Sequence, residues 1–394
     1  MPHAPRPMPH ALSSEALAKE GPISVVFSVT NCICYDQRVH KMAQAVSSLG
    51  CEVTIIGRVR GDCCKNDGVP FKTKRFKMFF NKGFLFYKFF NIRLFFYLLF
   101  HRFDILVAND LDTLLPNFLV ARVRNLKLVY DSHEYFTGVP ELSGRPFVKW
   151  IWILIERNIF PHLKYVITVS DSIADLYNTD YGVKPLVVRN LSPSSESLIP
   201  LTREELGIEA GHLLLILQGG GINIDKGGEE LIDAVNLTEK VSLILAGSGD
   251  VIPLLKEKVI KLGLSERIKF FPGMKWSELM RLTKSADAGL SLEKNTNINY
   301  RYSLPNKLFD YISAGIPVIT GNLPEIGKIV ESYDCGLIIP GITAAEISKA
   351  IIALRDNPEL RKRLKQNSVN AFVELNWNNE QEKVISLYRK ILKD

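Results

Sequence analysis

The segment Arg301–Thr320 constrains the fold more than any other, because it predicts a loop, a short helix and a buried strand in close succession. Pro305 has no backbone N–H to donate and suits the first helical turn, and Gly315 suits the left-handed residue that ends a helix. The N–H groups of this helix start lie beside the cation of Lys307 and favour anions, phosphate above all. We therefore predict an anion site at residues 303–307.

One helical turn further in, Asp310 is placed to accept hydrogen bonds from neutral hydroxyls such as those of a ribose. Leu308, Phe309 and Ile312 recur on one helical face, which indicates packing against a core. The alternative is that this segment is an ordinary packed helix and Ser303 is only its cap.

The rest of the chain alternates between strand and helix patterns, which is typical of doubly wound α/β domains. Predicted strands of the first half are 23–29, 52–57, 104–108, 126–130, 165–169 and 186–189, and those of the second are 213–217, 241–246, 267–271, 288–292 and 336–339. A Ser- and Pro-rich stretch at 190–202 predicts a hinge between them. We expect domains at 21–195 and 196–376, after a disordered extension at 1–20.

The length of 394 residues is too great for one compact core and suits two domains. The net charge of +7 is compatible with nucleic acid, an anionic membrane or anionic substrates. The six cysteines show no repeated C-x-x-C pattern, so we expect reduced thiols and a cytosolic protein. No apolar run reaches the roughly 18 residues of a spanning helix, and the N-terminus has no signal-type apolar core.

The stretch Phe71–Phe103 is rich in Phe, Lys and Arg and has no acidic residue. Such a surface adsorbs to anionic membranes, since aromatic rings enter the headgroup region while cations meet lipid phosphates. We rank nucleic-acid binding second, because no RNA-binding signature is present, and expect no nucleic-acid partner. The remaining alternative is a core helix at 83–101 with a few exposed cations.

Two further motifs suggest ligand chemistry. A glycine-rich loop, Gln218–Gly228, follows a predicted strand and opens a helix, which is the arrangement of a phosphate cradle. The pair Asp110 and Asp112 matches a short D-x-D metal motif, but two carboxylates at a helix start are also ordinary capping residues. We therefore expect no metal site.

The run Pro305–Tyr311, followed by Gly315 and Pro317–Val318, resembles the nucleotide-sugar segment of retaining GT-B glycosyltransferases of family 4. The resemblance covers nearly the whole chain after residue 20. It implies a GT-B fold, with two doubly wound Rossmann-like α/β domains facing across a cleft and a C-terminal helix, 377–394, that returns to the first domain. Asp310 stands where the family usually has Glu.

The resemblance also implies site residues. Lys226 matches the family's lysine that binds the donor diphosphate. Gly221 stands where the family usually has an arginine, and Tyr302 stands where it has the first of two glutamates. Glu293 is a candidate to replace that glutamate. We expect Lys307, Arg301 or Arg38 to compensate for the missing cation. The expected donor contacts are Gly220, Gly221, Lys226, Met274, Ser303, Leu304, Pro305, Asn306, Lys307 and Asp310. Catalytic roles are expected for His133, Lys226 and Asp310, and acceptor-side roles for Asn31, Asp36, Arg38 and Glu134.

The function implied is retaining transfer of a hexosyl or N-acetylhexosaminyl group from a nucleotide-diphosphate sugar to a glycan hydroxyl. With the membrane-seeking stretch, this predicts a lipid-linked or membrane-associated acceptor in cell-surface polysaccharide synthesis, and a cytoplasmic protein peripheral to the membrane. No catalytic metal or other cofactor is expected. The alternatives are a GT-B-fold epimerase or phosphorylase, or a non-catalytic nucleotide-sugar-binding subunit.

Overall fold

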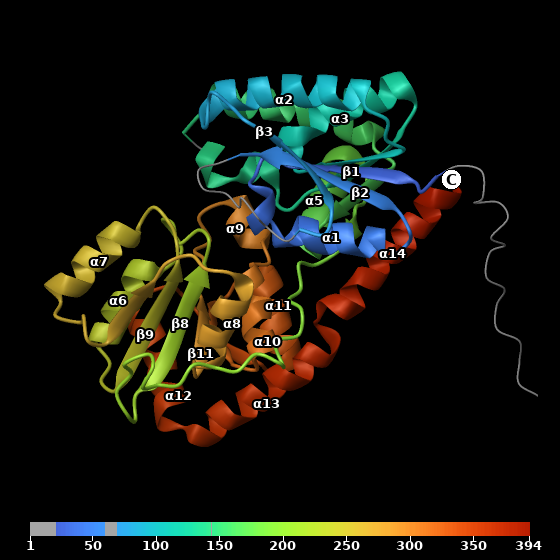
Figure 1. The fold of residues 1–394 in the computed structure, drawn as a ribbon. Helices are drawn as coiled ribbons and strands as arrows, with labels where there is room; N and C mark the ends of the chain where they lie inside the picture. Colours follow the sequence, from blue (N-terminus) through green and yellow to red (C-terminus); the bar gives the residue numbers. More distant parts are fainter. Residues whose placement is uncertain (1–20, 60–68, 143) are drawn as a thin grey trace, which may run out of the picture. The chain divides into compact units, whose positions relative to one another are not determined.

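The computed structural model describes residues 21–59, 69–142 and 144–394 (Figure 1). By its contacts the chain divides into two compact units, the first comprising Met1–Val129 and Ile391–Asp394 and the second Tyr130–Lys390. We describe each by itself. The predicted domain boundaries remain predictions.

Two parallel sheets organise the chain, with strand orders β3-β2-β1-β4-β5-β6-β7 and β10-β9-β8-β11-β12-β13. The strands of the first are β1 Ser24–Ser28, β2 Glu52–Arg58, β3 Lys72–Phe76, β4 Ile105–Asn109, β5 Lys127–Asp131, β6 Tyr165–Thr168 and β7 Leu186–Val187. Those of the second are β8 Leu213–Gly219, β9 Val241–Gly247, β10 Ile268–Phe271, β11 Ala288–Ser291, β12 Val318–Gly321 and β13 Gly336–Ile339. The prediction of two doubly wound, Rossmann-like α/β domains is thereby confirmed.

Helices connect the strands. They are α1 Gln37–Ser47, α2 Gly83–Phe100, α3 Leu111–Arg124, α4 Pro146–Ile159, α5 Asp171–Tyr181, α6 Gly228–Asn236, α7 Ile252–Lys261, α8 Trp276–Lys284, α9 Ile298–Tyr302, α10 Asn306–Ala314, α11 Pro324–Tyr333, α12 Ala344–Asp356, α13 Pro358–Glu374 and α14 Trp377–Lys393. The structure adds strand β3 and helix α9, which the sequence analysis did not predict.

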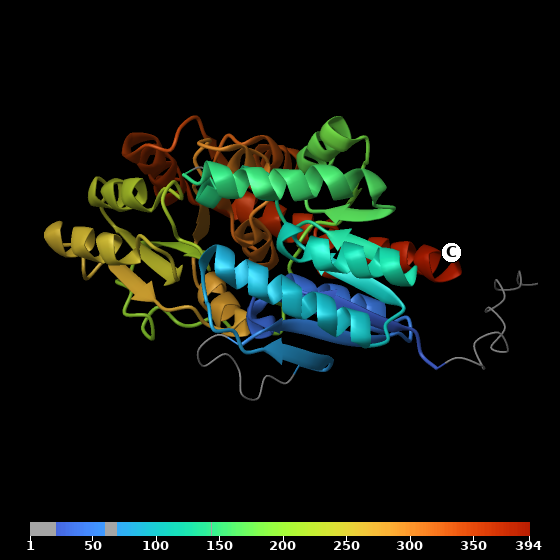
Figure 2. The same ribbon diagram turned by 90° about the horizontal axis from the view of Figure 1, so that it is seen from above.

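In the first unit, α2 covers the sheet next to α3 (Figures 1 and 2). Its residues Phe86, Phe90, Leu94 and Leu98 recur every four positions and are all buried. They pack on β1, β2 and β4 in a core that includes Val26, Ile56 and Leu106. The opposite side of α2 is also apolar but exposed.

In the second unit, strand β8 reads Leu-Leu-Leu-Ile-Leu and is buried on both faces, as expected for a central parallel strand. Because successive side chains point to opposite faces, Leu215 packs with helices α6, α7 and α12, whereas Ile216 packs with α8, α10 and α11. Figure 1 shows α6 and α7 on one side of this sheet and α8 and α10 on the other.

The Ser- and Pro-rich segment that the sequence predicts as a hinge is tied to α10 and α8. Ser195 Oγ donates to the carbonyl oxygen of Ser313 at 2.6 Å, and Ser313 Oγ donates to that of Pro193 at 2.8 Å. Lys284 Nζ donates to the carbonyl oxygens of Ser195 and Leu198 at 2.9 and 2.7 Å. We call residues 192–198 the strap.

One sequence prediction is wrong. Cys32 and Cys34 are disulfide-bonded rather than reduced, although Cys51 and Cys335 are free and buried. Cys63 and Cys64 lie outside the described residues. Within the described part of the chain, one helix, α2, is also long and apolar enough to cross a membrane by length and composition alone.

The glycine at the start of α6 generates a stability prediction. Gly227 has φ +70°, and a Cβ there would lie 2.5 Å from Leu292 Cβ and 2.8 Å from the Leu292 carbonyl oxygen. We expect Gly227→Ala to lower the free energy of unfolding by about 1–3 kcal/mol in urea titrations. Gly341→Ala is the control, since no atom lies within 4 Å of its Cβ position. Equal effects of the two substitutions would contradict this account.

Candidate functional site

The glycine-rich loop lies at the carboxyl ends of β8 and β9, where open α/β sheets bind their ligands. These two strands pair in parallel along their full length. Beyond them the Ile222 N–H donates to the Ser248 carbonyl oxygen at 2.8 Å, which pins one loop to the other. The chain then passes through Lys226 into α6, so the lysine precedes a helix start, as the sequence predicts.

A buried carboxylate holds Lys226 in place. Glu293 follows β11, and its side chain is fully buried. Its Oε1 lies 2.9 Å from Nζ of Lys307 and 3.7 Å from Nζ of Lys226. Ser291 Oγ donates to Oε2 at 2.7 Å. Residues from the loop after β8, from β11 and from the first turn of α10 therefore meet at one carboxylate.

Burial acts to raise the pKa of the Glu293 carboxyl, but the charges of Lys307 and Lys226 and the Ser291 hydroxyl outweigh it and lower this pKa to about 2. Glu293 is therefore ionised at neutral pH. Taken by itself, this group of two lysines and one carboxylate has an excess of one positive charge. Such an excess favours an anionic ligand.

A pocket of about 240 Å³ contains Lys226. It brings together two predicted donor residues, Gly221 and Lys226, and one predicted acceptor-side residue, Glu134. Its lining residues are Glu134, Pro140, Gly221, Asn223, Lys226, Asn299 and Tyr300. Within the pocket, Lys226 Nζ lies 4.0 Å from the centre of the Tyr300 ring, a cation–π contact that orients the ammonium group.

Helix α9 supplies two lining residues, Asn299 and Tyr300, that the sequence analysis did not identify. Asn299 Nδ2 donates to Glu134 Oε2 at 2.9 Å, and the Tyr135 N–H donates to Asn299 Oδ1 at 3.3 Å. The helix begins at a cap, since Asn297 Oδ1 accepts from the Tyr300 N–H at 2.8 Å. That cap is the one signal that predicts this short helix.

Helix α10 begins one residue later than the sequence analysis predicts, since that analysis placed Pro305 in the first helical turn. Pro305 is the residue before the helix, and Gly315 ends it with φ 68°. Ser303 Oγ donates to the Tyr300 carbonyl oxygen at 3.2 Å, and Leu304 is buried in the core of the second sheet. Asn306 accepts from the Asn190 side-chain amide at 2.8 Å. Nucleotide contacts by residues 303–306 remain predictions.

Asp310 is buried and anchors α10 to other elements. Its Oδ1 accepts from Ser192 Oγ at 2.6 Å and from Trp276 Nε1 at 3.1 Å, and its Oδ2 accepts from Gln218 Nε2 at 2.9 Å. Thr283 Oγ1 in turn donates to Gln218 Oε1 at 2.5 Å. The predicted ribose contact and catalytic role of Asp310 remain untested, and the structure adds this anchoring role.

Three other predicted residues, His133, Met274 and Gly220, lie outside the pocket lining. His133 lies two residues after the end of β5, and its Nε2 lies 3.4 Å from Oδ2 of the buried Asp131. Met274, between β10 and α8, is partly buried against the core of the second sheet. Gly220 belongs to the glycine-rich loop next to Gly221. The roles assigned to these residues remain predictions.

The remaining acceptor-side candidates belong to the first unit. Asp36 caps α1, because its Oδ1 accepts from the Val39 N–H at 3.1 Å. Arg38 is buried in α1 rather than solvated, and the Asn31 carbonyl oxygen accepts from the Arg58 N–H at 3.3 Å. None of these contacts tests an acceptor role.

The D-x-D pair has contacts of its own. Asp112 Oδ2 accepts from Thr30 Oγ1 at 2.5 Å, and Asp110 precedes α3 with φ 60°. Across the residues that the structure describes, no group of three or more His, Cys, Asp or Glu side chains is placed to hold a metal ion. A metal-independent reaction remains an expectation.

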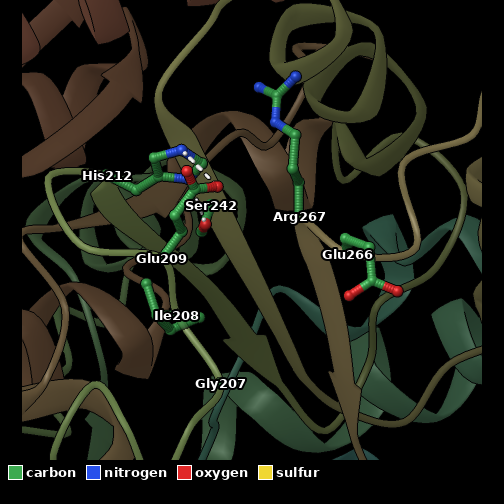
Figure 3. Close-up of a pocket in the computed structure, with 7 residues that line it drawn as sticks. All are labelled: Gly207, Ile208, Glu209, His212, Ser242, Glu266 and Arg267. Atoms are coloured by element: carbon green, nitrogen blue, oxygen red, sulfur yellow. Dashed lines mark hydrogen bonds and ion pairs between the residues drawn. The ribbon is translucent and has the colours of Figure 1, made fainter.

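A second pocket, of about 260 Å³, lies at the opposite, amino-terminal ends of β8, β9 and β10 (Figure 3). His212 Nδ1 lies 3.0 Å from Ser242 Oγ, and His212 Nε2 lies 3.2 Å from Glu209 Oε2. Arg267 points away from this group and donates to the carbonyl oxygens of Val235 and Val241. These contacts join the sheet to the preceding turns, so we assign this pocket a structural role.

The low pKa of Glu293 generates a prediction. A carboxyl whose pKa falls from 4.5 to about 2 on folding stabilises the protein above pH 4.5 and loses this effect as pH falls toward 2. At neutral pH, we expect Glu293→Gln to lower the free energy of unfolding by about 3 kcal/mol. The difference from the unsubstituted protein should shrink between pH 4.5 and pH 2 in urea titrations.

Glu266→Gln is the matched control, since that side chain is 97% exposed and 3.8 Å from Lys269. We expect its effect to stay within about 0.5 kcal/mol at every pH. A Glu293→Gln effect that does not change with pH would show that the carboxylate charge is not what stabilises this cluster.

Comparisons with known proteins agree with this architecture. Two chitobiosyldiphosphodolichol beta-mannosyltransferases, from Candida glabrata and Debaryomyces hansenii, are 24% and 30% identical to this chain over 306 and 301 residues. The matches cover 67% and 66% of this chain but 65% and 62% of those relatives, so the matched region spans a little less than two thirds of their length.

Solved structures share the fold. Sucrose-phosphate synthase from Thermosynechococcus elongatus has a TM-score of 0.76 at 15% identity, over 94% of this chain and 99% of that chain. Anabaena HepE in complex with UDP and glucose has a TM-score of 0.74 at 15% identity, over 93% and 100%.

Two family models match the two halves of the chain. Glycosyltransferase Family 4 matches residues 36–190, and Glycosyl transferases group 1 matches residues 203–370. Each model thus falls on one of the two sheets. By its fold and these two matches, the chain belongs to the GT-B glycosyltransferases.

Proposed function

We propose that this protein transfers a sugar, of hexosyl or N-acetylhexosaminyl type, from a nucleotide-diphosphate sugar to a hydroxyl group of a lipid-linked or membrane-associated glycan, with retention of anomeric configuration. The observation that carries the proposal is the cluster of Lys226, Lys307 and Glu293 beside the pocket at the carboxyl ends of β8 and β11. The solved complex of Anabaena HepE with UDP and glucose supports a nucleotide-sugar donor.

The cluster suits a diphosphate for an electrostatic reason. Lys226 and Lys307 have side chains only 18% and 11% exposed, so their charges are weakly screened by water. Glu293 keeps both ammonium groups in place before the donor binds. Preorganised charge stabilises a leaving group most effectively, because little reorganisation is needed as negative charge develops on the diphosphate.

In the retaining reaction that we propose, the bond between the sugar C1 and the diphosphate oxygen breaks as the acceptor oxygen bonds to C1 on the same face. The proton of the acceptor hydroxyl passes to a phosphate oxygen, so no protein nucleophile is needed. Lys226 and Lys307 stabilise the leaving diphosphate, while His133 and Glu134 position the sugar and the acceptor. No metal or other cofactor takes part in this scheme.

The acceptor proposal rests on two observations. Two relatives are named for transfer to chitobiosyldiphosphodolichol, which is a glycan on a lipid diphosphate. Helix α2 also exposes large apolar side chains on the side away from its core. These are Phe84, Leu85, Phe89, Ile92, Phe96 and Phe100, each more than 40% exposed.

The charged side chains on and near α2 indicate which kind of surface this helix binds. Lys77, Lys82, Lys88 and Arg93 are exposed, and no acidic residue occurs between Phe71 and Phe103. Aromatic rings combined with cations favour the headgroup region of an anionic bilayer. Because one face of α2 is packed in the core of the first unit, we propose that the helix lies on the membrane rather than across it. The protein is then peripheral to the membrane.

The donor site is tested by Lys226→Ala and Lys307→Ala. With radiolabelled UDP-, GDP- and dTDP-sugars and a synthetic chitobiosyl lipid diphosphate, we expect one donor to support transfer and each substitution to reduce kcat about 10²–10³-fold. Lys258→Ala is the matched control, because this lysine forms a 2.7 Å ion pair with Asp233 outside the pocket. Activity should also survive dialysis against EDTA.

Three other experimental results would indicate a different function or mechanism. Interconversion of the nucleotide sugar without an acceptor would identify an epimerase. Nucleotide binding in calorimetry without turnover of any donor would identify a binding subunit. Product NMR showing inverted anomeric configuration would overturn the retaining scheme and leave the donor site standing.

The membrane surface of α2 is tested by the double substitution Phe89→Ser and Phe96→Ser. In flotation with vesicles of phosphatidylcholine and phosphatidylglycerol, we expect binding to fall about tenfold or more, because both rings lose their apolar contact. Val373→Ser is the control, since that residue is 71% exposed on α13. Unchanged flotation of the α2 variant would contradict the proposed surface.

A further inference from the structure

Helix α4 of the second unit carries an exposed aromatic face that the nucleotide site does not use. Phe147, Trp150 and Leu154 are 69%, 56% and 47% exposed. Their spacing of three and four residues places them on one side of the helix. The Phe147 and Trp150 rings are stacked, with centroids 6.1 Å apart.

The opposite side of α4 is fixed in the protein. Trp152 is buried and packs edge-to-face on Phe136, with ring centroids 5.3 Å apart. Glu156 is fully buried, and its Oε2 accepts from Tyr181 OH at 2.9 Å and from Thr137 Oγ1 at 3.2 Å. The helix therefore presents Phe147, Trp150 and Leu154 from a rigid base.

The charges on α4 indicate what covers this face. Arg145 directly precedes the helix, and Arg157 lies one turn beyond Leu154; both are exposed. The one acidic residue of the helix, Glu156, faces the core. The exposed face is thus apolar in its middle and cationic at both ends. This pattern complements an anionic bilayer, since Trp and Phe enter the interfacial region while arginines meet lipid phosphates.

We propose that α4 is a second membrane-contact surface, formed by Phe147, Trp150 and Leu154 with Arg145 and Arg157, and that its partner is the surface of an anionic lipid bilayer. It belongs to the unit that contains the nucleotide pocket, whereas α2 belongs to the other unit. The proposal does not depend on glycosyl transfer, since a protein without transferase activity would bind lipid in the same way.

Tryptophan fluorescence tests the proposal directly. Of the four tryptophans, Trp150 is exposed, Trp152 and Trp377 are buried, and Trp276 is partly buried. With the full-length protein and vesicles of phosphatidylcholine and phosphatidylglycerol, we expect a shift of emission to shorter wavelength and quenching by brominated acyl chains. Trp150→Phe should abolish most of both changes and leave flotation intact, because an aromatic ring remains.

The double substitution Phe147→Ser and Leu154→Ser measures the contribution of the face. We expect the vesicle dissociation constant to rise about tenfold. Val373→Ser again serves as the control for an exposed apolar side chain, and unchanged thermal unfolding shows that the variants fold.

Three results would overturn the proposal. Flotation without lipid quenching of Trp150 would leave membrane binding to α2 alone. If the protein floats with neither neutral nor anionic vesicles, neither α2 nor α4 is a membrane-contact surface. A change in oligomeric mass on substitution of Phe147 and Leu154, with unchanged vesicle binding, would assign this face to contacts between proteins. None of these results bears on donor binding, which calorimetry with the nucleotide measures separately.

Discussion

The ionised carboxylate of Glu293 in a fully buried position is the constraint on which the candidate site depends. An unpaired charge in such a place costs several kcal/mol, and here two lysines and a hydroxyl compensate for it. Each lysine comes from a different segment, Lys226 from the glycine-rich loop and Lys307 from α10. The carboxylate thereby determines how these two segments approach each other and where their positive charge is presented.

The residues around Glu293, Lys226 and Lys307 also fix the positions of the loops that form the pocket. Gly227 lets the loop after β8 pass against Leu292, the neighbour of Glu293 in sequence. Tyr300 places its ring against the Lys226 ammonium group, and Asn299 joins the same short helix to Glu134. The pocket is therefore built from loops that are short, mutually bonded and supported by central strands, which limits the reorganisation that a bound donor would require.

The sequence predicted the fold well because its signals were local. Alternating apolar strands and capped helices identified both sheets, and Pro305 and Gly315 gave the limits of α10 closely. Lys226, Gly221 and Glu134 were singled out and meet in one pocket. The role of Glu293 between two lysines required knowledge of tertiary contacts, because 67 residues separate Lys226 from Glu293 in the chain. Helix α9 was missed because its five residues are too few to show an apolar periodicity. The disulfide bonding of Cys32 and Cys34 was missed because the six cysteines show no repeated C-x-x-C pattern.

The strap at residues 192–198 has a consequence for motion. Its serines and the carboxylate of Asp310 join it to α10, and Lys284 joins it to α8. The hinge that the Ser- and Pro-rich composition predicts at 190–202 remains a prediction. A change of backbone angles within the strap would break several of its hydrogen bonds at once, and each broken bond costs free energy. Bending of the chain at residues 192–198 therefore requires release of the strap from α8 and from α10, the helix that carries Lys307.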